Sequence, residues 1–202
     1  MKIALVGASG NVGTRIAAEA LGRGHDVTAI ARNVSAIAPQ EHLRAVAADV
    51  TDEAAAAALS GHDCVVLSVR FQGLDFERVL EIVRRSGVAR LLVVGGAASL
   101  EVKPGLALID TPDFPDFIKP EAEPARQALG RLRKETEIDW TFLSPSVFFE
   151  AGARTGTFRL GGDALLTAAD GKSHISYEDY AIALLDEIEQ PKHSRARFTV
   201  GY

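Results

Sequence analysis

The sequence predicts a doubly wound α/β fold with a mostly parallel sheet. Short apolar segments alternate along the chain with segments of helical periodicity, the order that builds βαβ units. The apolar segments are continuous runs, which is typical of strands that helices cover on both faces. A glycine-rich turn over residues 7–13 joins the first apolar segment to the first helical one. Together these observations favour an open sheet with helices on both sides.

In the first half of the chain, strands are expected over residues 3–6, 27–31, 43–48 and 64–69. A helix is expected over residues 12–23, because Ile16 and Ala20 recur on one face at helical spacing. A short alanine-rich helix is expected over residues 53–59, just before the fourth strand. This order places the first βαβ unit at the start of the sheet.

In the second half, strands are expected over residues 91–94, 140–143 and 197–200, and helices over residues 75–86, 121–137 and 177–189. Ser176 stands before the last helix as its N-cap, with Asp179 at the capping-box position. The charged residues near the end of the long helix predict a solvated face; they are Arg131, Arg133, Lys134, Glu135 and Glu137.

Two long segments interrupt this alternation. Residues 96–120 are rich in Pro, Asp and Phe, and residues 145–175 are irregular and contain glycine. Both follow the carboxyl ends of expected strands, where open α/β sheets bind their ligands. We therefore expect one domain over residues 1–202 with these two segments on the substrate side.

Composition limits the classes of function. The chain has 202 residues, a net charge of −5 and no basic cluster, so nucleic acid is not the expected partner. No apolar stretch approaches the roughly 20 residues of a membrane span, and we expect a cytoplasmic protein. Its single cysteine and scattered histidines show no metal-ligand spacing, so no metal is expected.

The glycine-rich turn predicts a dinucleotide site. Gly7, Gly10 and Gly13 follow a strand and open a helix, which is the context that makes a glycine pattern informative. Helix amides that point at a phosphate group, together with the helix dipole, bind anions. We expect the pyrophosphate of a nicotinamide dinucleotide to meet this turn, including its residues Ser9, Asn11 and Val12.

The end of the second strand favours NADP(H) over NAD(H). Sites for NAD usually carry an acidic residue there to bind the ribose hydroxyls, whereas here Arg32 follows the strand. Arginine suits a 2′-phosphate because it binds phosphate in a bidentate manner. The alternative is a solvated arginine that begins a surface loop. Ser68, Val69 and Arg70 end the fourth strand beside the expected dinucleotide, where Arg70 could touch the pyrophosphate or an anionic substrate.

The segment from Val6 to Gly13 resembles the signature of atypical and extended short-chain dehydrogenase/reductases of the Rossmann type. Three further segments resemble one group within that superfamily, the NAD(P)-binding proteins described as NADH-flavin reductases. A relative of this class reduces flavins and biliverdin. These segments are residues 92–100, 139–145 and 175–181. The resemblance covers essentially the whole chain and implies a flavin reductase-like activity.

The resemblance also implies site roles. Asp49, next to Val50, is similar to the residue that contacts adenine, although an N-cap for the next helix is the alternative. The backbone at Pro145 and Ser146 is implied to meet the nicotinamide carboxamide. Ser99 and Lys119 are the candidate catalytic residues, with a turn serine and a solvated loop lysine as the alternatives.

The superfamily's Tyr-x-x-x-Lys catalytic pair is missing, because no tyrosine here precedes a lysine by four residues. A flavin accepts hydride without an enzyme acid, so a reductase of a flavin, quinone or similar planar acceptor stays the favoured function. Phenylalanines of the two long segments could form its platform: Phe114, Phe117, Phe148 and Phe149. The alternative is a dinucleotide-binding sensor without activity. We expect a monomer or a homodimer.

Overall fold

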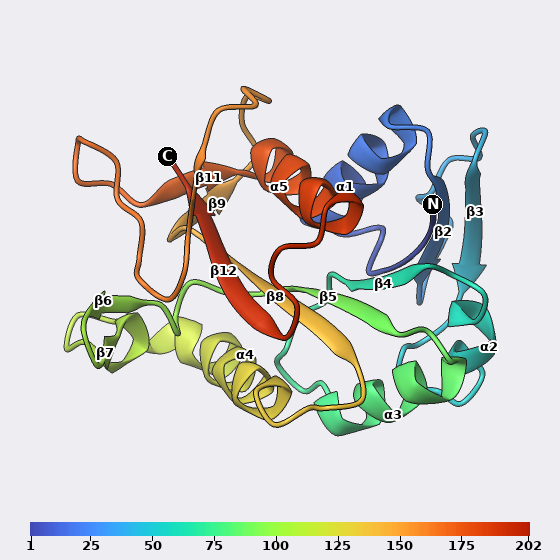
Figure 1. The fold of residues 1–202 in the computed structure, drawn as a ribbon, viewed down its shortest axis with the longest axis horizontal. Helices are drawn as coiled ribbons and strands as arrows, with labels where there is room; N and C mark the ends of the chain where they lie inside the picture. Colours follow the sequence, from blue (N-terminus) through green and yellow to red (C-terminus); the bar gives the residue numbers. More distant parts are fainter.

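The computed structural model describes residues 1–202 and contains a central eight-stranded sheet with helices on both faces (Figure 1). The strands follow the order β10-β12-β8-β5-β4-β1-β2-β3. All neighbouring strands are parallel except β10 and β12, which are antiparallel. The strand order reverses direction at β1 and β4, as in doubly wound sheets. The predicted fold class is confirmed.

The strands of the central sheet are β1 (Lys2–Val6), β2 (Asp26–Ala31), β3 (Leu43–Ala47), β4 (Cys64–Leu67), β5 (Arg90–Val94), β8 (Asp139–Pro145), β10 (Arg159–Gly161) and β12 (Ala196–Gly201). The helices are α1 (Asn11–Gly22), α2 (Ala55–Leu59), α3 (Phe76–Ser86), α4 (Lys119–Leu132) and α5 (Tyr177–Glu189). None of them combines the length and the apolar character that a membrane crossing requires.

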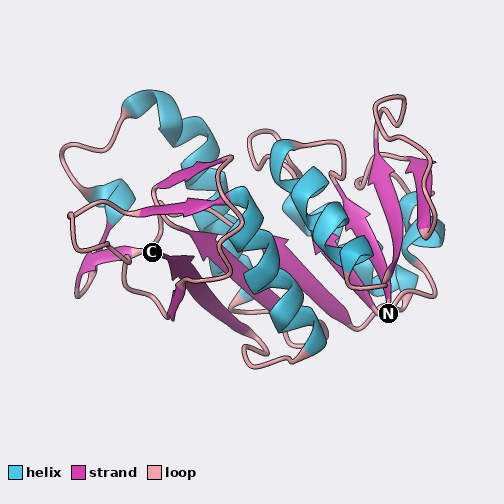
Figure 2. Ribbon diagram, turned by 90° about the horizontal axis from the view of Figure 1, so that it is seen from above, coloured by secondary structure: helices cyan, strands magenta, loops and turns pink.

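The helices divide between the two faces of the sheet. Helices α1 and α5 lie together on one face, and α2, α3 and α4 lie on the other (Figures 1 and 2). Successive residues of β1 enter different cores: Ile3 and Leu5 belong to the core under α1 and α5, whereas Ala4 and Val6 belong to the other. The strands are continuous apolar runs because both of their faces are buried.

The two long segments contain short elements that the sequence did not predict. They are β6 (Glu101–Lys103), β7 (Leu106–Ala107), the 3₁₀ turns η1 (Leu108–Asp110) and η2 (Asp116–Ile118), β9 (Phe148–Glu150) and β11 (His174–Ser176), in addition to β10. These elements have only two or three residues each, too few to show a hydrophobic period.

The long helix α4 differs from its prediction at both ends. It begins at Lys119 and ends at Leu132, so the charged residues beyond it do not continue a solvated helix face. Glu135 is buried and accepts hydrogen bonds from the Arg84 guanidinium at 2.6 Å and the Glu137 amide at 2.8 Å. Burial raises the pKa of Glu135, but these donors outweigh it and bring the pKa to about 2. Glu135 thus stabilises the turn into β8.

Candidate dinucleotide and acceptor site

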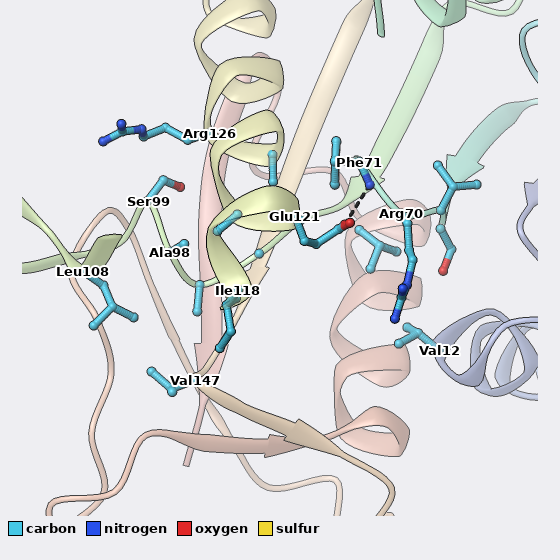
Figure 3. A pocket seen from close by; sticks show the side chains of 18 of the residues that line it. Val12, Arg70, Phe71, Ala98, Ser99, Leu108, Ile118, Glu121, Arg126 and Val147 are labelled. Carbon is cyan, nitrogen blue, oxygen red and sulfur yellow. Dashed lines mark hydrogen bonds between the residues drawn. The ribbon is translucent and has the colours of Figure 1, made fainter. Parts of the chain in front are cut away.

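Two cavities adjoin at the carboxyl edge of the sheet. The first, here the β2 cavity, measures about 460 Å³ and is lined by Arg32 and Asp49 among others. The second, here the α4 cavity, measures about 450 Å³ and extends from the start of α1 to the start of α4 (Figure 3). Both are lined by Gly10, Ser68, Val69 and Arg70. An extended ligand that crosses Gly10 would therefore enter both cavities.

The three glycines of the turn have different tasks. Gly7 has a φ of 84°, and a Cβ there would stand 1.9 Å from the Ser68 carbonyl oxygen. A Cβ on Gly13 would stand 2.2 Å from the Gly7 carbonyl oxygen. At Gly10 a Cβ would meet only that same oxygen, at 3.3 Å. Gly7 and Gly13 are required by the fold, whereas Gly10 keeps the space between the two cavities open.

The start of α1 offers free hydrogen-bond donors at this junction. Gly10 is the N-cap and supplies no side-chain acceptor. The amides of Ser9, Asn11 and Val12 donate to no acceptor within the protein. Free amides at a positive helix end are suited to bind an anion, so this turn fits a dinucleotide pyrophosphate.

Arg32 and Asp49 lie at the far side of the β2 cavity. The Arg32 side chain is exposed and forms no ion pair with a carboxylate. Asp49 accepts hydrogen bonds from the Thr51 amide at 3.0 Å and the Thr51 hydroxyl at 2.7 Å. These bonds, with the charge of Arg32, lower the pKa of Asp49. Asp49 does not cap α2, whose N-cap is Ala54, but it fixes the turn after β3.

The segment after β4 forms the wall between the cavities. Arg70 is exposed there, and its side chain extends towards Val12 at the start of α1 (Figure 3). The Glu121 carboxylate accepts the amides of Phe71 at 2.7 Å and Gln72 at 3.0 Å, and thus connects α4 to this segment. No sequence pattern identified Glu121, because its partners are 50 and 49 residues away.

The two candidate catalytic residues are placed differently. Ser99 lines the α4 cavity, and its hydroxyl accepts a hydrogen bond from Arg197 at 3.3 Å. Lys119 is not among the residues that line the cavity; its ammonium group pairs with Asp116 at 2.7 Å. The structure therefore does not bring Ser99 and Lys119 together.

The segment after β8 reaches the cavity one residue later than expected. Pro145 ends β8, and Ser146 is buried with its hydroxyl donating to the Val200 carbonyl oxygen at 3.1 Å. Neither residue lines the α4 cavity, whereas Val147 does.

The tyrosines are also separated by the structure. Tyr177 lines the α4 cavity, and its hydroxyl has no hydrogen-bond partner in the protein. Tyr180 is buried and donates to the Leu143 carbonyl oxygen at 2.7 Å, and burial raises its pKa. Tyr202 donates to Asp179 at 2.7 Å. Tyr177 is thus the one tyrosine that could touch a ligand in this cavity.

The start of α5 confirms one half of its predicted cap and corrects the other. The Ser176 hydroxyl accepts the Asp179 amide at 3.0 Å, as expected for an N-cap. The Asp179 carboxylate does not return to the Ser176 amide; it accepts the amides of Thr155 at 2.8 Å and Gly156 at 2.9 Å. Asp179 therefore holds the long segment after β9 against the helix.

The comparison with known proteins assigns the family. Residues 7–191 match the family described as NAD(P)H-binding. YwnB of Bacillus subtilis (strain 168), an uncharacterised protein, is 43% identical to this chain over 99% of it and 98% of that protein. The chain belongs to the NAD(P)H-binding family, and the resemblance expected from the sequence is confirmed.

Solved structures support the same assignment. A Bacteroides thetaiotaomicron protein described as a candidate epimerase superposes with a TM-score of 0.94 at 42% identity, covering 100% of this chain and 96% of that one. A Streptococcus pneumoniae TIGR4 protein described as a candidate NADH-flavin reductase gives 0.88 at 35% identity, covering 100% and 99%. These two descriptions name different chemistries, so they do not define one reaction for the family.

Proposed function

We propose that this protein is an NADPH-dependent oxidoreductase that reduces a flavin or a similar planar acceptor. The observation that carries the proposal is the pair of cavities that adjoin at Gly10. The β2 cavity presents a cation and a carboxylate, whereas 13 of the 22 residues that line the α4 cavity are hydrophobic. A polar site for a dinucleotide next to an apolar site for a ring is the arrangement that hydride transfer requires.

The chain's own groups have defined tasks in this proposal. The amides at the start of α1 bind the pyrophosphate, Arg32 binds the 2′-phosphate, and Asp49 contacts the adenine. The backbone of Val50 and of residues 68–70 completes the dinucleotide wall. The segment after β8, which reaches the α4 cavity at Val147, orients the carboxamide. When bound, the nicotinamide supplies the hydride.

On the acceptor side the apolar walls exclude water and hold the planar ring close to the cofactor. Phe114 and Tyr177 line this side of the α4 cavity. Ser99 is the proposed polar contact, and Lys119 would have to release Asp116 to reach a ligand. The lack of a tyrosine–lysine pair suits an acceptor that needs no proton from the protein in the hydride step.

The candidate flavin reductase at 35% identity supports the same acceptor class. We further propose that residues 1–202 act as one domain in the cytoplasm, as a monomer or a homodimer, on a small molecule. Nucleic acid is not proposed as a partner.

The test is NADPH oxidation by the purified protein with FMN, menadione and biliverdin as separate acceptors. We expect oxidation that depends on the acceptor, and none in Gly10→Val, which serves as a cofactor-site control. If the protein binds NADPH but oxidises it with none of the three acceptors, the proposal is contradicted. That result would favour the alternative of a dinucleotide-binding sensor, which the missing catalytic pair also fits.

A further inference from the structure

Four of the protein's exposed large hydrophobic residues come from two segments at the α4 cavity. Phe117 and Ile118 precede α4, and Val147 and Phe148 follow β8. Phe117 is 85% exposed and Phe148 is 57% exposed. We call these four residues the apolar rim. Scattered exposed hydrophobic residues are ordinary, but a group of them beside a cavity indicates a binding surface.

The rim is continuous with the cavity. Ile118 and Val147 line the α4 cavity and are also 39% and 42% exposed, so they stand at its opening. Figure 3 shows them on the same side of the cavity, Ile118 from the start of α4 and Val147 from the segment after β8. Phe117 and Phe148 are their immediate neighbours in the chain. Neither phenylalanine lines the α4 cavity itself, so a ligand would reach them by extending past Ile118 and Val147 at the opening.

The fold does not explain why Phe117 and Phe148 are large and apolar. Neither ring stacks on another aromatic ring, whereas Phe149 packs against Tyr177 and Tyr180 with ring centroids 4.7 Å apart in each pair. Phe114 lies inside the cavity. The four phenylalanines predicted as one platform thus divide into one cavity residue, one core residue and two rim residues.

We propose that the apolar rim selects acceptors by the number of their fused rings. The inner ring occupies the α4 cavity beside the nicotinamide site, and the outer ring covers Phe117 and Phe148. The substrate class is a planar polycyclic acceptor of two or three fused rings rather than a single-ring one. This inference rests on the proposed function for the identity of the ligand, but size selection can be measured without turnover.

The test uses benzenesulfonate, naphthalene-2-sulfonate and anthracene-2-sulfonate, which share one charge, differ in ring number and accept no hydride. Their binding to the NADP⁺-saturated protein is measured by calorimetry. We expect affinity to rise by roughly fivefold for each added ring, because each buries more apolar area. In Phe117→Ser and Phe148→Ser this increase should shrink from the second ring onward, because the second ring is the first to reach the rim. Phe117→Leu should retain most of it.

The matched control is Leu160→Ser, which removes a 50% exposed apolar side chain from β10, outside the α4 cavity. It should leave the affinity series unchanged. Equal losses for all three ligands, or the same loss in Leu160→Ser, would overturn the proposal. Sedimentation tests the alternative occupant, which is a second copy of the chain. If the wild-type protein is a dimer and Phe117→Ser dissociates it, a second copy covers the rim and the proposal is overturned. Size selection without any NADPH oxidation would instead contradict the proposed function alone.

Discussion

The two cavities are built in different ways. The β2 cavity and the junction at Gly10 are lined by residues from the short turns that follow β1, β2, β3 and β4. The α4 cavity depends on side chains that join distant parts of the chain, such as Glu121 with Phe71 and Arg197 with Ser99. The β2 cavity and its junction depend on local sequence, because a glycine at a given position of the turn satisfies the conformation that the backbone needs there. The α4 cavity depends on the finished fold.

The largest effect is expected at the junction of the two cavities. Gly10→Val should abolish measurable cofactor binding, with an increase in Kd of about 100-fold or more. Its side chain would enter the space proposed for the pyrophosphate at the free amides. The fold should survive, since a Cβ at Gly10 meets only one atom, at 3.3 Å. Titration of NADPH with circular dichroism as the folding check measures both.

Two matched variants sharpen this result. Gly130→Val lies on α4, where a Cβ meets nothing within 4 Å, and should leave binding intact. Gly7→Val should prevent folding, because it adds a clash at 1.9 Å to a positive φ. A folded Gly10→Val protein that binds NADPH normally would show that this turn is only a connection between β1 and α1.

The next effect concerns a side-chain network at the start of α5, outside both cavities. Asp179 is fully buried and accepts four hydrogen bonds, from Thr155, Gly156 and Tyr202. Asp179→Asn should lower the free energy of unfolding by about 3 kcal/mol, because an amide cannot replace a buried carboxylate in this network. Urea unfolding at pH 7 measures the loss, and the exposed Asp186→Asn on the same helix is the control.

The difference in stability between the wild-type protein and Asp179→Asn has a defined pH dependence. Burial raises the pKa of Asp179, but the hydrogen bonds it accepts outweigh burial and hold its pKa below the ordinary value. Its stabilising contribution is therefore complete above the unfolded pKa of about 3.9 and is lost as the pH falls through the folded pKa. The difference between wild type and Asp179→Asn should shrink only below about pH 4. A difference that vanishes at neutral pH would contradict this account.

A smaller effect is expected at Arg32, the proposed contact for the 2′-phosphate. Arg32→Ala should weaken NADPH binding by about 1.5–3 kcal/mol and leave NADH binding nearly unchanged. Arg44→Ala is the matched control, because this exposed arginine lies in a groove at the opposite end of the strands. Equal affinity of the wild-type protein for NADPH and NADH would refute the assignment of Arg32.

The contrast between the cavities also explains what could be predicted from sequence. The strands β1 and β2, the helix α5 over residues 177–189 and the turn after β1 were predicted because each depends on local periodicity or on glycine. Glu121 and the partners of Asp179 were missed because no sequence rule gives the position of a carboxylate relative to amides more than 20 residues away. No residue of β3 is buried, although its apolar sequence predicted burial, because β3 is the edge strand and pairs only with β2.

The smallest effect should come from removing the hydroxyl of Tyr177, and this prediction tests the mechanism most directly. Tyr180 cannot donate a proton to a ligand, because it is buried and bonded to Leu143, whereas Tyr177 lines the α4 cavity. If the acceptor is a flavin, the residues around it position a ring and need not supply a proton. Tyr177→Phe should then lower kcat with FMN by less than about tenfold, since a general acid contributes about 10²- to 10⁴-fold.

Ser99→Ala and Lys119→Met should cost similarly little, and Tyr180→Phe should reduce stability rather than kcat, because it removes a buried hydrogen bond. The measurement is kcat for all four variants, with NADPH affinity determined in parallel. A loss of about 100-fold or more in Tyr177→Phe alone, with cofactor binding intact, would identify Tyr177 as a general acid. The α4 cavity would then act through a proton donor contributed by α5, and carbonyl acceptors would replace flavins as the substrates to test.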